Sequence, residues 1–242
     1  MPRPGARAER EIATFTEEMR AALGEELVCL VLHGSAAGDE WVAGRSDLNT
    51  ALVVPCVTLA VLERLAPLVA RWRERGFALP VVMDYEYLRR ARDTFPMELD
   101  DISRQHRLLA GTDLFANLTL DPKALRRECE REARGKLLRL RALFLDTGRT
   151  PAAIEQLMVE SVKSFLVVLR HLVHLRHADG GHGYGAVLAA GESIVGPLPT
   201  MRKLLALRAG DARLSPAALR AAFGAYLAEV ERIVEGVDAL DA

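Results

Sequence analysis

Two short apolar runs near the start of the chain enclose residues whose types are suited to binding a phosphate group and a metal ion. The runs, residues 28–32 and 50–54, are bounded by turn residues and contain β-branched side chains, so both are predicted to be buried strands. Between them lie Gly34-Ser35 and, after eleven further residues, Asp47-Leu48-Asn49. A small pair at the end of a strand lets a phosphate approach the backbone closely. Carboxylate and carboxamide oxygens are ligands that Mg²⁺ accepts. The segment therefore predicts a place to hold a metal–triphosphate.

Each of these side chains also has an ordinary structural explanation. Alternation along the second strand places Asp47 and Asn49 on one face and Leu48 on the other. We expect Asp47 to be a metal ligand; otherwise it is a turn aspartate that hydrogen-bonds within its own loop. Gly34 and Ser35 would receive phosphates through backbone N–H groups and the Ser35 hydroxyl, or would cap a helix that follows the strand. Asn49 can offer a neutral carbonyl oxygen to the metal, or can hydrogen-bond within the strand pair.

A further carboxylate is expected to complete such a site. The next predicted strand, residues 80–83, contains none, and Asp84 follows only at its end. Glu98 and Asp101 are the alternatives, on a segment whose acids a solvated surface would also explain. We favour Glu98, because Met97 and Leu99 would face the core and place Glu98 on the opposite side.

This arrangement resembles the signature of the polymerase-β-like nucleotidyltransferase superfamily, in which a Gly-Ser or Gly-Gly pair ends one strand and an acidic-x-acidic pair opens the next. Here Asp47 matches the first acid, whereas Asn49 stands in place of the second. The resemblance covers about the first half of the chain. It implies a metal-dependent transfer of a nucleoside monophosphate from a nucleoside triphosphate to a hydroxyl on a small molecule, a protein or an RNA.

The resemblance also assigns roles to the matched residues. Asp47 would be catalytic, Gly34 and Ser35 would bind the nucleotide phosphates, and Asp47 and Asn49 would hold Mg²⁺ or Mn²⁺. Glu98, which lies outside the matched motif, would be the further catalytic carboxylate. Because Asn49 carries no charge, the alternative is a catalytically degenerate member of this fold that binds a nucleotide or a partner protein. A third hypothesis is a helical ribonuclease, from the spacing of Arg170 and His177.

The helices and strands predicted around these residues together form a small mixed α/β domain. Ile12, Phe15, Met19 and Leu23 recur at helical spacing and predict a helix over residues 6–23. A second helix is predicted over residues 59–75 and a short one over residues 85–91. Residues 95–99 are expected to be extended, because Pro96 disfavours helix at the residue before it, and residues 104–109 are expected to be a short helix.

Beyond about residue 120 the pattern is helical. Three helices are predicted to begin with a capping residue followed by proline, at Asp121-Pro122, Thr150-Pro151 and Ser215-Pro216. The helix after Thr150 is apolar nearly all round, which is typical of the central helix of a bundle. The predicted fold class is therefore α+β, with a nucleotidyltransferase-like domain over residues 1–118 and a helical bundle over residues 119–242. The resemblance implies that the second domain closes one wall of a cleft.

Three other patterns are better explained by structure than by chemistry. His171, His174 and His177 are expected to be half-buried residues at a helix edge, because no cysteine or carboxylate lies near them at ligand spacing. The glycine-rich residues 180–185 follow a helix instead of a strand, so they are expected to be a loop. Residues 123–141 contain eight Lys or Arg and three Glu, which is common for a solvated helix face, although such a run can also meet a triphosphate or an RNA backbone.

Composition narrows the class of protein further. The 242 residues carry 32 basic and 33 acidic side chains, a formal net charge of −1, so we expect neither strong nucleic-acid binding nor an acidic membrane partner. No run is apolar enough to span a membrane. The three cysteines lie in apolar surroundings without ligand spacing, which favours a reducing cytoplasm. The base of the nucleotide, the acceptor and the oligomeric state stay open.

Overall fold

The structure is a computed structural model that describes residues 4–38, 41, 46–147, 150–176, 183–210 and 215–240. His177 and residues 180–182, for which the sequence makes predictions, lie outside these ranges. The chain divides into two compact units, Met1–Asp121 and Pro122–Ala242. The domain boundary predicted between residues 118 and 119 stays a prediction.

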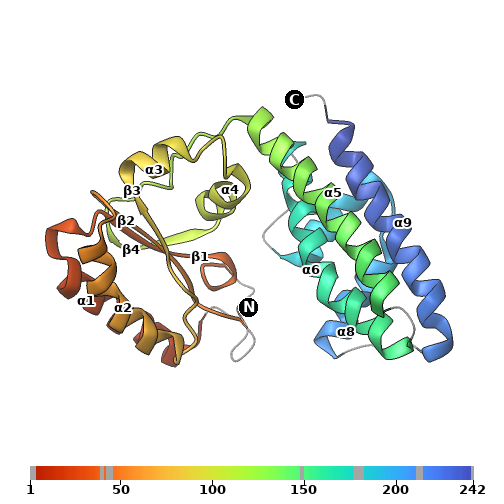
Figure 1. Cartoon of the computed structure of the whole chain (residues 1–242), viewed down its shortest axis with the longest axis horizontal. Helices are drawn as coiled ribbons and strands as arrows, with labels where there is room; N and C mark the ends of the chain where they lie inside the picture. The colour runs from red at the N-terminus through yellow and green to blue at the C-terminus, as the bar shows by residue number, and fades with distance from the viewer. Residues whose placement is uncertain are drawn as a thin grey trace. The chain divides into compact units, whose positions relative to one another are not determined.

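The first unit is built on a four-stranded mixed sheet with the strand order β3-β2-β1-β4 (Figure 1). The strand β1 pairs antiparallel with β2 and with β4, and β2 pairs parallel with β3. The strands are β1 (Cys29–His33), β2 (Asn49–Val54), β3 (Val81–Asp84) and β4 (His106–Gly111).

Helices cover both faces of this sheet and give the unit two apolar cores. Leu30, Leu32 and Leu52 point toward α1 (Ala6–Leu23) and α2 (Leu59–Arg73). Strand alternation turns Val31, Ala51 and Val53 to the other face, where they pack with residues of α3 (Tyr85–Arg90) and α4 (Pro96–Arg104). Figure 1 shows the two helix pairs on opposite sides of the strands. The unit is therefore a three-layer sandwich.

Local sequence accounts for several of the helix boundaries. Ile12, Phe15, Met19 and Leu23 are buried along one side of α1, as the sequence predicts, and Gly24 follows the helix with a φ of 55°. Thr58 caps α2 by accepting a hydrogen bond from the backbone N–H of Val61.

Two predicted elements of the first unit are wrong. Residues 95–99 are not extended, because α4 begins at Pro96. Proline is accepted at the first helical position, where its missing N–H has no partner to lose, and only Phe95 before it is non-helical, with φ −127° and ψ 48°. Residues 104–109 do not form a helix, because β4 begins at His106. The edge of β1 that does not pair with β2 supplies the hydrogen-bond partners of β4.

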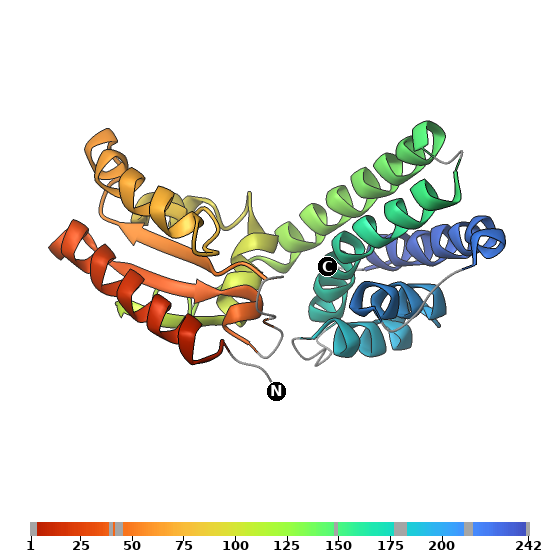
Figure 2. The same cartoon turned by 90° about the horizontal axis from the view of Figure 1, so that it is seen from below.

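Among its described residues the second unit contains helices and no strand, which confirms the predicted α+β fold class. Its central helix α6 packs against α5, α7, α8 and α9, and its residues Ile154, Met158, Val162, Leu166 and Leu169 are fully buried. Thr150 caps α6 through the N–H of Ala153. Figures 1 and 2 show α5, α6 and α9 running side by side. The helices are α5 (Pro122–Thr147), α6 (Pro151–Leu175), α7 (Tyr184–Val195), α8 (Pro199–Ala209) and α9 (Leu219–Asp238).

Within the described part of the chain, no helix is both long enough and apolar enough to cross a membrane.

Candidate functional site

One end of the sheet carries a row of polar side chains on three neighbouring strands. His33, the last residue of β1, pairs with Asn49 of β2 on one side and with His106 of β4 on the other. Directly paired residues share a face of the sheet. Because Cys29 and Val31 face α3 and α4, the alternation places this row on the same face. The register thus brings together residues separated by up to 73 positions in the sequence, from 33 to 106.

The Gly34 loop begins at this row and is shaped by close contacts. Residues Gly34–Ala36 form one 3₁₀ turn, and Gly34 has a φ of 69°, a conformation that favours glycine. A Cβ added at Gly34 would lie 3.4 Å from Nδ2 of Asn49. The predicted phosphate loop and the predicted carboxamide ligand are therefore direct neighbours. The alternative role of Ser35 as a helix cap is wrong, because only this three-residue turn follows the strand, its N-cap is His33, and no side chain caps it.

Asp47 lies just before β2 and is exposed, whereas Asn49 is partly buried. The segment is held by a parallel bridge, in which the Leu48 N–H donates to the Gly76 carbonyl oxygen at 2.9 Å and the Leu48 carbonyl accepts from Ala78 at 3.1 Å. Leu48 is buried in the core beneath α1 and α2, which confirms the predicted alternation at this residue.

Asp47 also lines a groove of about 550 Å³ in the first unit. The start of α1 contributes Arg7 and Glu11 to its wall, and the end of α2 contributes Glu74 and Arg75. Gly34 and Ser35 are not among the described residues that line it. The expectation that Asp47 and the Gly34 loop face one cleft stays a prediction.

The carboxylates considered for the third position lie in three different places. Asp84 is at the other end of the sheet, paired with Val54, and it caps α3 by accepting the N–H of Tyr87 at 2.7 Å. Glu98 is exposed in the first turn of α4. Asp101 lies in the last turn of α4, close enough to His33 to influence its protonation. Among these three, Asp101 is the one that the structure brings toward the polar row.

The first residue of the row, His33, is kept neutral by its surroundings. Burial lowers the pKa of His33 to about 4; the Asp101 carboxylate opposes this shift, and the charge of His106 adds to it. His33 therefore contributes an uncharged imidazole next to Asn49 at neutral pH.

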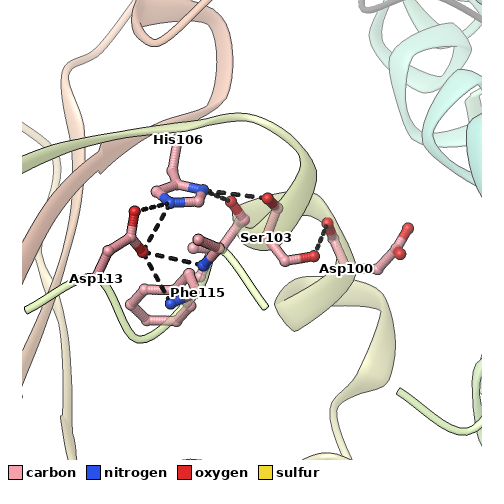
Figure 3. Close-up of polar contacts among 7 residues, drawn as sticks. Asp100, Ser103, His106, Asp113 and Phe115 are labelled. Carbon is pink, nitrogen blue, oxygen red and sulfur yellow. Dashed lines mark hydrogen bonds and ion pairs between the residues drawn. The ribbon is translucent and has the colours of Figure 1, made fainter. Parts of the chain in front are cut away.

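His106, at the other side of His33, has hydrogen-bond partners on both of its ring nitrogens. Its Nδ1 lies 2.9 Å from the carbonyl oxygen of Ile102 and 3.1 Å from that of Ser103, and its Nε2 lies 3.0 Å from both carboxylate oxygens of Asp113 (Figure 3). All of these partners are acceptors. Burial acts to raise the pKa of Asp113, but hydrogen bonds from His106 and from the N–H groups of Phe115 and Ala116 lower it overall. Both ring nitrogens of His106 therefore face oxygen acceptors, on α4 and on Asp113.

The sequence analysis missed His106, Asp113 and Gln105. His106 begins β4 and Asp113 follows the end of that strand, so no periodic pattern of a single element connects them. Asp113 alone had a local indication, because an aspartate after Gly111-Thr112 is typical of a turn in which the side chain accepts backbone N–H groups.

The basic residues of α5 and the histidines of α6 mostly have the structural roles that the sequence predicts. Along α5, Arg126, Arg134, Lys136 and Arg141 each form an ion pair with an acidic residue of α5 or α9. The rings of His171 and His174 meet edge to face at 5.8 Å between centroids. His174 is partly buried as predicted, but His171 is fully buried, because the apolar surroundings of α6 extend further round the helix than the histidine spacing indicates.

Comparison with known proteins adds one result on the fold. No protein-family model matches the sequence, and no curated protein matches it at a significant level. Among solved structures, the chain is similar to spectinomycin adenyltransferase AAD(9) from Enterococcus faecialis, which was solved with ATP and spectinomycin. The likeness covers 95% of this chain and 99% of that one, with a TM-score of 0.53 and 12% sequence identity. Together with the sheet order and the helical second unit, it shows that the chain shares the fold of that adenyltransferase.

Proposed function

We propose that this protein is a metal-dependent nucleotidyltransferase that moves a nucleoside monophosphate from a nucleoside triphosphate to a hydroxyl acceptor. The observation that carries the proposal is the contact between Gly34 and Asn49 at one end of the sheet, on a fold shared with an adenyltransferase. This supports the proposal, because a loop suited to phosphate lies beside a carboxamide side chain whose oxygen can bind a metal ion.

The residues present fit a magnesium or manganese ion. Mg²⁺ takes oxygen ligands and retains several waters, so one carboxylate and one carboxamide suffice from the protein when phosphate oxygens complete the shell. Asp47 would supply the negative charge and Asn49 a carbonyl oxygen. The bound ion would neutralise charge on the phosphates during transfer.

The chain's own groups have defined tasks in this reaction. Gly34 and Ser35 would hold the β- and γ-phosphates through backbone N–H groups and the Ser35 hydroxyl. The acceptor hydroxyl attacks the α-phosphorus, the bond to the bridging oxygen breaks, and pyrophosphate leaves with the electron pair. A carboxylate of α4, Glu98 or its alternative Asp101, would receive the proton of the hydroxyl.

Asp101 is the better placed of these two carboxylates. It lies four residues before Gln105, whose carbonyl oxygen binds the Gly34 N–H. Glu98 lies seven residues before Gln105, about 10 Å along the helix at 1.5 Å per residue. Activity that falls in Asp101→Asn and survives in Glu98→Gln would assign the base to Asp101, and the reverse result would assign it to Glu98.

A specific observation favours a second function, a nucleotide- or partner-binding module that catalyses no transfer. Asn49 removes one charge from the metal site, and the strand β3 has its acid, Asp84, at the end of the sheet away from Asn49. This candidate keeps the phosphate loop and the fold but lacks the charge needed to stabilise the transition state.

The test is incubation of the protein with each α-labelled nucleoside triphosphate, Mg²⁺ or Mn²⁺, and a pool of small molecules, protein or RNA as acceptor. Transfer of label that depends on Asp47 supports the enzyme. Saturable binding of triphosphate without transfer supports the second candidate, and neither binding nor transfer contradicts both. Spectinomycin, the molecule bound to the similar adenyltransferase, is the first small acceptor to include.

A further inference from the structure

Gln105 connects the end of α4 to both ends of the Gly34 loop, residues 34–38. Its carbonyl oxygen accepts the N–H of Gly34 at 3.1 Å. Its side chain lies against Gly38, where an added Cβ would stand only 1.8 Å from Nε2 of Gln105. One residue therefore supports the loop where it leaves β1 and again four residues later.

The side-chain amide of Gln105 can donate a further hydrogen bond. Its Nε2 is buried and has no hydrogen-bond partner among the residues that the structure describes. A buried donor without a partner is costly, and such groups often mark a place where a ligand or water binds. The unpaired donor lies beside the loop to which the phosphates are assigned.

The ring of His106 holds this part of the chain in place. The last carbonyl groups of a helix lack partners and carry partial negative charge. His106 donates Nδ1–H to two of them, on Ile102 and Ser103, and donates Nε2–H to Asp113 (Figure 3). Asp113 is itself fixed, because its Oδ1 accepts the N–H groups of Phe115 and Ala116 at 3.0 Å. The end of α4 is thereby attached to the segment that follows β4.

We propose that His106 and Asp113 are positioning residues for the Gly34 loop, acting through Gln105, and that Gln105 is a further contact to the anion bound there. Because Gln105 immediately precedes His106, loosening the ring from the carbonyl groups of α4 releases the carbonyl that orients the Gly34 N–H. The assignment of the loop to phosphate rests on the proposed function, but the mechanical link from His106 to Gly34 does not.

The neighbouring residue Arg107 provides a matched control. It faces the opposite side of β4, where its Nη1 and Nη2 each donate to Glu9 of α1 at 3.0 Å. Glu9→Gln weakens a two-point charged contact of the same strand without touching α4. If His106→Ala acted only by a general loss of stability in the first unit, Glu9→Gln should therefore change the Gly34 loop in the same way.

The first measurement is amide hydrogen exchange in the full-length protein without any nucleotide. We expect the Gly34 amide to exchange on the order of tenfold faster or more in His106→Ala and Asp113→Ala, to a smaller extent in His106→Gln, and unchanged in Glu9→Gln. His106→Gln is intermediate because a carboxamide can donate to α4 or to Asp113 but not reproduce both contacts. Unchanged Gly34 exchange in the alanine variants, or equal acceleration in Glu9→Gln, would overturn the positioning role.

The second measurement is the Kd for ATP with Mg²⁺. We expect His106→Ala and Gln105→Ala to weaken binding about tenfold or more, as is usual for groups that orient or complete a binding shell, with Glu9→Gln close to wild type. Equal affinities in Gln105→Ala and wild type would overturn the anion contact. If the wild type itself binds no nucleotide, the proposed function fails, whereas the exchange data still decide whether His106 positions the loop.

Discussion

The backbone N–H of Gly34 donates to the carbonyl oxygen of Gln105 over 3.1 Å, so the loop after β1 is attached to the end of α4 as well as to its own strand. The strand register aligns Asn49, His33 and His106, and this contact holds the Gly34 loop beside that row. The row lies where β1, β2, β4 and the end of α4 meet. A change at the end of α4 should therefore be detectable at the Gly34 loop.

Asp47→Asn should abolish nucleotidyl transfer while leaving the fold intact. Asp47 is the one full negative charge in the Asp47-Leu48-Asn49 motif, so the metal would lose most of its electrostatic attraction to this position. We expect a loss of about a hundredfold or more in kcat/KM, measured with an α-labelled triphosphate. Because Asp47 is exposed, the Tm should stay close to wild type. Glu74→Gln, which neutralises another acid of the same groove, should retain activity.

Asn49→Asp separates the two candidate functions. A second carboxylate beside Asp47 should tighten Mg²⁺ binding in either case, which titration calorimetry can measure. In a working site adapted to a carboxamide, the added charge should repel Asp47 and lower the transfer rate. Transfer that appears only in Asn49→Asp would instead identify the natural protein as a binding module.

Gly111→Ala should strongly destabilise the first unit. An added Cβ would lie 2.1 Å from the carbonyl oxygen of Val28 and 2.7 Å from its carbon, and Gly111 has a φ of 79°. The clash is with backbone and cannot be relieved by a side-chain rotation, so we expect the free energy of unfolding to fall by about 3 kcal/mol.

Gly135→Ala is the matched control for that substitution. Gly135 is exposed within α5, and a Cβ there would meet nothing within 4 Å. Alanine favours helix over glycine, so the second unit should gain about 0.5–1 kcal/mol in a denaturant titration. Equal effects of the two substitutions would contradict the backbone contact between Gly111 and Val28.

The contribution of Asp113 to stability should disappear in acid. Its folded pKa is lowered from the ordinary value of 3.8, so the folded state binds this proton less tightly than the unfolded state. The contribution is therefore fully present above about pH 4 and is lost as the pH falls through the lower folded pKa. Unfolding of wild type and Asp113→Asn across this range should show a difference in stability that shrinks as the pH falls. Asp93→Asn, which removes an exposed carboxylate, is the matched control.

The amino-acid sequence by itself determined the parts of this protein that depend on neighbouring residues. The apolar run of residues 50–54, the helical spacing of α1 and the Thr150-Pro151 start of α6 are local patterns, and each element lies where they predict. The Gly34-Ser35 and Asp47-Leu48-Asn49 motifs likewise led to the nucleotidyltransferase fold. The same rule about proline that correctly described Phe95 misplaced the residues after Pro96, because a proline can begin a helix as readily as it can interrupt one.

Only the tertiary structure decided which strand edge β4 would join and which groups would surround the Gly34 loop. The residues of β4 have no partner within their own segment, and their hydrogen bonds are made with β1, more than seventy positions earlier. The role of His106 likewise depends on its contacts with the carbonyl groups of α4 and with Asp113, and the residues beside it in the sequence do not indicate these contacts. Local propensity cannot encode such contacts, because their free energy exists only after chain segments that are distant in sequence have met.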